Sequence, residues 1–214
     1  MDHRSVTAED YLKIIDELTL YKGFATLNDI SKFLSVTRQS VYDEMNILIE
    51  QKLVERTNKG EYVLTPSGKK EANIFLRKHR IAEILLSRSI NMPWNLLDSE
   101  AMGIEHGITE NIAKLVCDTY GCKTCPHGNP VPDEDGNVTD PDDLFFRDLR
   151  PLSRFKISRV IFESSEVLNF LHKHDLLPGS TIEVGEDGEV LVSGSGGRAS
   201  VPESISTAVK YIEF

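Results

Sequence analysis

The sequence is short of several features that mark common protein classes. Within its 214 residues, no uncharged apolar run approaches the roughly 18 residues of a membrane span, so we expect no transmembrane helix. Its three cysteines all lie between residues 117 and 125, which is a poor disulfide framework and favours a reducing cytoplasm. No apolar stretch follows Met1-Asp2-His3-Arg4, so we expect no secretory signal.

The basic excess that is usual for nucleic-acid-binding chains is also missing. Lys and Arg number 24 against 34 Asp and Glu, a formal net charge of -10. The acidity is uneven: residues 71–150 hold 8 basic and 14 acidic residues, whereas residues 1–70 hold 10 and 11. The acidic middle is therefore either a solvated surface or a region that binds cations. The 40% apolar fraction is ordinary for a globular chain, and the length allows two or three small domains.

Residues 1–72 show the pattern of a winged helix. Thr7 is predicted to cap a helix that ends at Gly23, because the apolar residues between them recur at helical spacing. A short helix over residues 27–34 and a longer one after Thr37 are separated by only a few residues, which is typical of a helix-turn-helix. A hairpin over residues 53–64 would follow as the wing.

The second helix of a helix-turn-helix contacts DNA bases from its N-terminal end. Here that end is polar, and no acidic residue occurs between Ile30 and Tyr42. We therefore predict DNA contacts, although a winged helix used for protein contacts is the alternative. The predicted DNA-binding residues are Thr7, Lys32, Thr37, Arg38, Gln39, Ser40, Tyr42 and Lys59.

The middle of the chain is predicted to be helical. Thr65-Pro66 is a typical helix start, and this helix should run to about Arg88. A second helix is predicted from Asp98 to about Tyr120, although two glycines within it lower its helix propensity.

Side chains that bind metals recur on both helices at spacings that place them on one face. The first helix carries His79 and Glu83, four residues apart. The second carries Asp98, Met102, Glu105 and His106. Carboxylates, imidazoles and a thioether suit a divalent transition metal. Spacing alone leaves open that these are surface pairs and a buried structural histidine.

The pattern changes in the last third of the chain. Residues 126–141 hold four of the nine prolines together with a run of acids, which predicts a linker or mobile loop. Apolar residues then alternate with period two, and several short segments separated by turns predict a small β-barrel. The predicted strands lie at 157–162, 181–185, 189–193 and 209–214, with a helix at 164–172 and turns at 186–188 and 194–197.

The cysteines allow a further metal site. Cys117, Cys122, Cys125 and His127 have a C-x4-C-x2-C-x-H spacing that resembles a zinc-binding set, and a single C-x-x-C can be redox active. Turn structure and loop packing are the alternative, which we prefer.

Taken together, the motifs resemble those of the diphtheria toxin repressor (DtxR) and iron-dependent regulator family. The resemblance rests on residues 77–83, Glu100-Ala101-Met102 and Glu105-His106, and on a Leu-Leu-Pro-Gly turn like that of FeoA-type modules. It implies a mainly α-helical fold with a small β-barrel. The implied domains are a winged helix (1–72), a helical metal-binding and dimerisation domain (73–125), a Pro-rich acidic linker (126–150) and an SH3-like domain (151–214).

The resemblance also implies two metal sites. The primary site would consist of Asp10, Met102, Glu105 and His106, and the ancillary site of His79, Glu83, Asp98, Glu163 and Glu166. The soft thioether of Met102 favours Fe²⁺ as the metal, with Mn²⁺ second and Co²⁺, Ni²⁺ or Zn²⁺ as surrogates.

The function implied is a metal-activated, homodimeric repressor that binds palindromic double-stranded operator DNA in the cytoplasm and controls metal homeostasis. A metal-independent or a redox-sensing winged-helix regulator is the alternative. A metalloenzyme is a weaker one, because the sequence contains neither a His-Glu-x-x-His motif nor a Gly-rich phosphate loop. We expect no enzymatic activity and no membrane partner.

Overall fold

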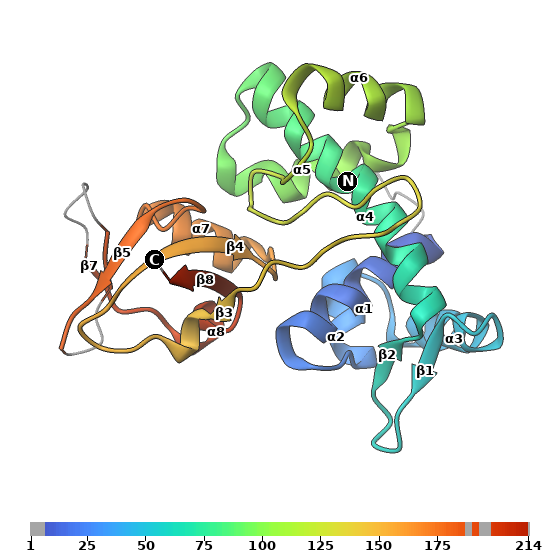
Figure 1. The fold of residues 1–214 in the computed structure, drawn as a ribbon. Helices are drawn as coiled ribbons and strands as arrows, with labels where there is room; N and C mark the ends of the chain where they lie inside the picture. Colours follow the sequence, from blue (N-terminus) through green and yellow to red (C-terminus); the bar gives the residue numbers. More distant parts are fainter. Residues whose placement is uncertain (1–6, 187–189, 193–197, 214) are drawn as a thin grey trace. The chain divides into compact units, whose positions relative to one another are not determined.

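The computed structural model describes residues 7–186, 190–192 and 198–213 (Figure 1). The chain forms two compact units. The first consists of Met1–Arg77 with Pro132–Val138, and the second of Lys78–Val131 with Thr139–Phe214. Among the described helices, none combines the length and the apolar character needed to cross a membrane.

The first two helices of the first unit are defined by their caps. Helix α1 (Ala8–Lys22) begins where the Asp10 carboxylate accepts hydrogen bonds from the backbone N–H (2.7 Å) and hydroxyl (2.9 Å) of Thr7. It ends at Gly23, whose φ of 91° suits glycine. Helix α2 (Leu27–Leu34) has the same kind of capping box at its start. Both predicted helices are confirmed.

Helix α3 (Arg38–Glu50) is the second helix of the helix-turn-helix. The hydroxyl of Thr37 caps it by accepting the Ser40 backbone N–H at 3.1 Å. Its inward face buries Val41, Met45 and Leu48 completely, as their spacing predicts. The opposite face and the N-terminal end are left exposed.

The predicted wing is confirmed as an antiparallel hairpin of β1 (Val54–Arg56) and β2 (Tyr62–Leu64). Ala25, between α1 and α2, adds a bridge on the outer side of β2, with hydrogen bonds of 2.8 and 2.9 Å to Tyr62. The hairpin is thereby attached to the helices, and its turn projects away from them (Figure 1).

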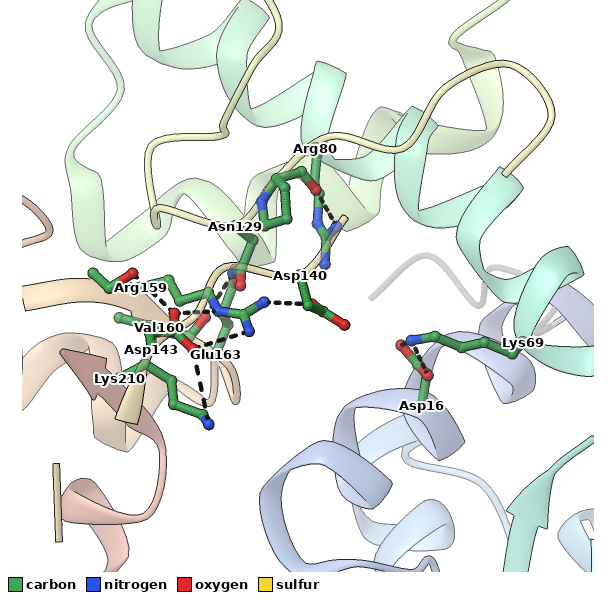
Figure 2. Close-up of polar contacts among 12 residues, drawn as sticks. Asp16, Lys69, Arg80, Asn129, Asp140, Asp143, Arg159, Val160, Glu163 and Lys210 are labelled. Atoms are coloured by element: carbon green, nitrogen blue, oxygen red, sulfur yellow. Dashed lines mark hydrogen bonds and ion pairs between the residues drawn. The ribbon is translucent and has the colours of Figure 1, made fainter. Parts of the chain in front are cut away.

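Helix α4 (Pro66–Ile90) begins in the first unit, as the Thr65-Pro66 signal predicts. The Thr65 hydroxyl accepts the Gly68 backbone N–H at 3.0 Å. The ammonium of Lys69 contacts both carboxylate oxygens of Asp16 on α1, at 2.6 and 2.8 Å (Figure 2). These contacts hold the start of α4 against the wing and against α1.

Gly68→Ala is expected to destabilise the first unit by about 3 kcal/mol. A Cβ at this position would overlap the backbone carbonyl oxygen of Leu53, so either the helix or the wing must move. Chemical denaturation followed by circular dichroism measures the change. Gly103→Ala is the matched control, because a Cβ in that helix meets open space and adds helix propensity. Equal stability of the two variants would contradict the prediction.

In the second unit, the helix predicted from Asp98 to Tyr120 is wrong as a single element. The chain instead forms α5 (Leu97–Ile104), a 3₁₀ turn η2 (Glu105–Gly107) and α6 (Glu110–Tyr120), preceded by the 3₁₀ turn η1 (Trp94–Leu96). The break has a local cause: Thr109 caps a new helix by accepting the Ile112 N–H. These helices pack on the second half of α4 around a core of Ile81, Ala82, Ile84, Ala101, Ile108, Ala113, Val116 and Cys125.

The Pro-rich segment has fixed partners rather than the character of a mobile loop. In the first unit, the Asn73 amide donates to the Gly136 carbonyl (2.9 Å) and the Arg77 guanidinium to the Pro132 carbonyl (3.0 Å). In the second unit, the Arg80 guanidinium donates to the Pro130 carbonyl (Figure 2). Thr124 also forms a bridge with Pro130. The prolines thus leave carbonyl acceptors that the polar side chains of α4 use.

The last part of the second unit contains a six-stranded antiparallel sheet in the order β3-β8-β4-β5-β6-β7. The predicted strands are confirmed where they are described; residues 187–189 and 193–197, including most of two predicted turns, lie outside the described residues. Strands β3 and β7 and helix α8 are not predicted. The elements are β3 (Leu144–Phe145), η3 (Phe146–Asp148), β4 (Arg154–Val160), α7 (Ser165–Lys173), β5 (Thr181–Val184), β6 (Val190–Val192), β7 (Arg198–Ala199), α8 (Glu203–Ser206) and β8 (Val209–Glu213).

An ion cluster joins β4 to the segment before β3 (Figure 2). Arg159 is 5% exposed, and its guanidinium contacts Asp143 and Asp140, each at 2.9 Å. Lys210 of β8 lies 3.9 Å from Asp143. Because the Asp143 side chain is almost completely buried, these charges hold the end of the acidic segment on the sheet.

Candidate metal centre and DNA-binding surface

Three buried polar side chains from α4 and α5 meet inside the second unit. His79 and Glu83 lie one turn apart on α4, and Asp98 lies at the start of α5. Their exposures are 2%, 0% and 8%. Nε2 of His79 is 3.3 Å from a carboxylate oxygen of Asp98 and 3.9 Å from one of Glu83. The predicted spacing therefore does bring these ligand types together.

The other ring nitrogen of His79 has its own partner. Nδ1 lies 2.6 Å from Oε2 of Glu105, which is completely buried on η2. A carboxylate that accepts from Nδ1–H leaves Nε2 as the ligating atom, which is the usual outer contact of a metal-binding histidine. Glu105 therefore orients His79 toward Asp98.

A tight turn at residues 125–129 adds two more side chains to this region. His127 is completely buried, and its Nδ1 lies 2.5 Å from Oε1 of Glu83 and 2.7 Å from Oε2 of Glu163. The Cys125 thiol, 4% exposed, hydrogen-bonds to Glu83. We call His79 and Asp98 the helix pair and Cys125 and His127 the turn pair; with Glu83 and Glu163 they form the buried cluster.

Backbone contacts hold the turn against the sheet. The Val160 N–H donates to the His127 carbonyl at 2.9 Å, and the Asn129 amide donates to the Val160 carbonyl at 2.6 Å. The same amide donates to Oε1 of Glu163 at 2.7 Å, as Figure 2 shows. Glu163 directly precedes Ser164, which caps α7. The Asn129 amide therefore holds the Glu163 carboxylate beside His127, at the start of this helix.

Trp94 fixes the His127 ring. Its carbonyl oxygen lies 3.1 Å from Nε2 of His127, and its indole packs edge-on against the imidazole at 4.7 Å between ring centres. The indole N–H in turn donates to the Pro126 carbonyl at 2.9 Å. An Nε2–H that donates to a carbonyl leaves Nδ1, which faces Glu83 and Glu163, as the ring atom that can bind a metal once its proton is displaced.

The cluster has the properties of a cation site. Both oxygens of Glu83, Nδ1 of His127 and Oε2 of Glu163 are buried, and Nδ1 lies within 2.7 Å of both carboxylates. Glu83, Asp98, Glu105 and Glu163 are four buried carboxylates, against two imidazoles. Buried charge requires pairing or coordination. The residues present therefore fit a bound divalent transition metal.

The pKa directions reflect this crowding. Burial alone would raise the pKa of Glu83, but the charges of His127 and His79 hold it below its ordinary value. Burial and the charge of Glu83 raise the pKa of Glu163. Burial opposes protonation of His127, yet Glu163 and Glu83 raise its pKa well above its ordinary value. Burial and the same two carboxylates raise the pKa of the Cys125 thiol. Without metal, the site therefore retains protons that metal binding must displace.

The structure regroups the predicted metal ligands. Among the described residues, the donors whose ligand atoms lie within 4.8 Å of one another include one set of His79, Asp98 and Glu163 and another of Glu83, Cys125, His127 and Glu163. Glu166 belongs to neither set and lies exposed on the first turn of α7.

The four-residue zinc set is wrong as a unit. Cys117 and Cys122 are joined in a disulfide across the end of α6, so neither offers a thiolate, and the expectation of unpaired cysteines is also contradicted. Cys125 and His127 face the buried carboxylates instead. The C-x-H spacing of Cys125 and His127 did indicate a metal site. The residues that these two side chains contact, Glu83 and Glu163, are far away in sequence.

The predicted primary-site residues fall in both units. Asp10 is buried in the first unit, where its carboxylate caps α1. Met102, Glu105 and His106 belong to the second unit, on α5 and η2 rather than on one helix, and only Glu105 is fully buried.

The predicted DNA-binding residues form an exposed surface at the start of α3. Thr37, Arg38, Gln39, Ser40 and Tyr42 are exposed, as are Lys32 on α2 and Lys59 at the wing turn. The Gln39 amide donates to Asp43 at 2.8 Å, and Thr37 and Ser40 share a hydrogen bond of 2.8 Å. Thr7 differs, because it is half-buried and engaged with Asp10.

Comparisons with known proteins bear on this arrangement. Residues 65–133 match the family model for the metal-binding and dimerisation domain of iron-dependent repressors. The crystal structure of T. acidophilum IdeR is 50% identical, covers 99% of this chain and 100% of its own, and superimposes with a TM-score of 0.94. A manganese-dependent transcriptional repressor in complex with manganese, 21% identical and with a TM-score of 0.83 over 97% of this chain and 100% of its own, shares the fold.

Two curated relatives extend the comparison. The diphtheria toxin repressor of Corynebacterium diphtheriae is 26% identical over 224 residues, which is 97% of each chain. The iron-dependent repressor IdeR of Mycobacterium tuberculosis is 31% identical over 128 residues, or 59% of this chain and 55% of the relative. The match thus spans about half the length of the mycobacterial protein.

Proposed function

The chain belongs to the iron-dependent repressor family that includes IdeR and the diphtheria toxin repressor, and from this membership we propose that it is a metal-activated transcriptional repressor. The observation that carries the proposal is the buried cluster, whose carboxylate, imidazole and thiol groups converge in two sets, with the ligand atoms of each set within 4.8 Å of one another. We further propose Fe²⁺ as the physiological metal and Mn²⁺ as the next candidate, because Met102 offers a soft thioether.

The proposed ligands follow the two predicted sites. Asp10 would join Met102, Glu105 and His106 in the primary site. The buried cluster would serve as the ancillary site. It keeps four residues of the predicted set, adds the turn pair and leaves out the exposed Glu166. A bound ion would supply the positive charge that the buried carboxylates lack.

Glu105 has two roles in this proposal. One of its oxygens orients His79, and the residue is also a proposed primary ligand. Because His106 follows it on the same 3₁₀ turn, a change at η2 reaches both sites.

Operator recognition is proposed for the exposed N-terminal end of α3. Its polar side chains match those that donate to phosphates and base edges, and no acidic residue lies among them. A homodimer would present two such helices to a palindrome. Exposed apolar side chains on α6 suit that dimer contact, with Leu115 66% and Ile112 37% exposed.

Operator binding measured against free metal tests this function. An operator is first selected from a random duplex library with metal present. Binding to it is then followed by fluorescence anisotropy with anaerobic Fe²⁺, with Mn²⁺ and with chelator. We expect tight binding with metal and loss of binding in chelator. Equally tight binding in chelator would favour a metal-independent regulator and would overturn the proposal.

A redox-sensing regulator is a second candidate, and the Cys117–Cys122 disulfide is the observation that favours it. Reduction would free two thiols at the end of α6, next to the turn that carries Cys125. A Cys117→Ser/Cys122→Ser variant with an unchanged DNA response to oxidant and reductant would remove this candidate.

A further inference from the structure

We propose that the buried cluster holds two divalent transition-metal ions rather than one. The helix pair with Glu163 would hold the first ion. The turn pair with Glu83 and Glu163 would hold the second, so that Glu163 is shared. This inference concerns the metal content of the second unit, and it stands or falls without reference to DNA.

The grouping of the donors favours two ions. In the described part of the chain, the six side chains of the cluster do not form one set of mutually close donors. They fall into two sets, and only Glu163 occurs in both. Glu163 suits a shared position, because its carboxylate is held in place by the Asn129 amide at 2.7 Å. A single ion would leave one of the two pairs without a role.

Each half has its own orienting contact. His79 is positioned through Nδ1 by Glu105, and His127 through Nε2 by the Trp94 carbonyl. The ring atoms left to bind metal are therefore Nε2 of His79 and Nδ1 of His127. These contacts come from different elements, η2 and η1, and each has the form of the outer contact that fixes a ligating histidine.

The charge of the region also favours two ions. Four carboxylates are buried here, those of Glu83, Asp98, Glu105 and Glu163. The neighbouring Arg80 guanidinium donates to the Pro130 carbonyl, which is neutral, so its positive charge still acts on this region. With Cys125 bound as a thiolate the region carries five negative charges, which two divalent ions and Arg80 balance. One divalent ion would leave a net negative charge in a dry interior.

The two halves differ in chemistry. The helix pair supplies a carboxylate and an imidazole, a set of moderate hardness. The turn pair supplies a thiol and an imidazole, which suit Zn²⁺, Co²⁺ or Fe²⁺. Co²⁺ is therefore an informative probe, because a cobalt–thiolate bond has a near-ultraviolet charge-transfer band that reports the second half alone.

The test counts Co²⁺ on the full-length chain. Met102→Ala and His106→Ala remove the proposed primary site, and Cys117→Ser and Cys122→Ser leave Cys125 as the only thiol. In this background we expect two Co²⁺ per chain by elemental analysis after desalting, together with the thiolate band. Cys125→Ser/His127→Gln should reduce the count to one and abolish the band. His79→Gln/Asp98→Asn should also reduce it to one but retain the band.

Glu100→Gln is the matched control, because this exposed carboxylate lies in the same first turn of α5 as Asp98 but outside both sets, so its loss should leave two ions. A single ion in the background chain would overturn the proposal. Loss of all Co²⁺ in both pair variants would indicate one composite site and would also overturn the proposal. An unchanged count in the Cys125→Ser/His127→Gln variant would overturn it as well. If the chain with the four background substitutions fails to fold, the pair substitutions are made in the otherwise wild-type chain and Co²⁺ is counted again. A primary-site ion then adds to each Co²⁺ count. Because DNA is absent throughout, failure here is distinguishable from failure of the proposed repressor function.

Discussion

His106→Ala is expected to raise the free-metal concentration needed for operator binding by about 100-fold or more. Loss of even an outer contact of a metal ligand typically costs about 10- to 100-fold in affinity, and a direct ligand should cost at least as much. His106 is half-buried on η2, so its truncation removes little packing. The variant should therefore fold normally and fail in its response to metal.

The arithmetic of a two-state switch shows why one ligand matters so much. To move a population from 1:99 to 99:1, metal must bind the DNA-competent form about 10⁴-fold more tightly than the other form. If His106 supplies about 100-fold of that preference, the variant reaches only about 1:1 in saturating metal. Anisotropy titrations against free Fe²⁺ and Mn²⁺ would measure both the midpoint and the plateau.

His172→Ala is the matched control for this experiment. His172 is exposed on α7 and belongs to neither set of clustered donors, so its loss should leave both the midpoint and the plateau unchanged. A His106→Ala chain that responds to metal like the wild type would remove His106 from the proposed primary site. Thermal denaturation of both variants verifies that they are folded.

Gly128→Ala is expected to destabilise the second unit by about 4 kcal/mol. Gly128 has a φ of 86°, which strains any side chain, and a Cβ there would overlap the Ser158 carbonyl oxygen and lie 2.9 Å from Cα of Arg159. The turn would have to leave β4, together with the hydrogen bond between the Val160 N–H and the His127 carbonyl. Because the turn carries Cys125 and His127, metal affinity of the buried cluster should fall by at least about 10-fold.

Gly179→Ala separates strain from overlap. Its φ of 92° is as unfavourable as that of Gly128, but a Cβ there meets no atom within 4 Å. We expect it to cost only about 1 kcal/mol and to leave Co²⁺ binding unchanged. Denaturation curves and Co²⁺ titrations of the two variants give the comparison. Similar losses in both would show that the packing of the turn on β4 is unimportant.

Several elements followed from the sequence because their causes are local. The cap at Thr7 and the apolar spacing after it predict α1, and Thr65-Pro66 predicts the start of α4. Helical spacing predicts α2 and α3, and the structure adds their caps at Thr26 and Thr37. These signals involve contacts between residues only a few positions apart, and such contacts cost little chain entropy to form. The break before α6 is the exception: Thr109 carries the capping signal, but continuous apolar spacing obscured it.

The ligand types, too, were evident from the sequence, whereas their grouping was decided only by the tertiary structure. His79 and Glu83 share a helix face by periodicity alone. His127 meets Glu83 only because the Pro-rich segment folds back on α4, and Glu163 joins them only because the Asn129 amide holds it. Contacts between residues far apart in sequence depend on the packing of whole elements, which no local pattern records. For the same reason the disulfide and the position of Cys125 in the cluster could not be predicted from cysteine spacing.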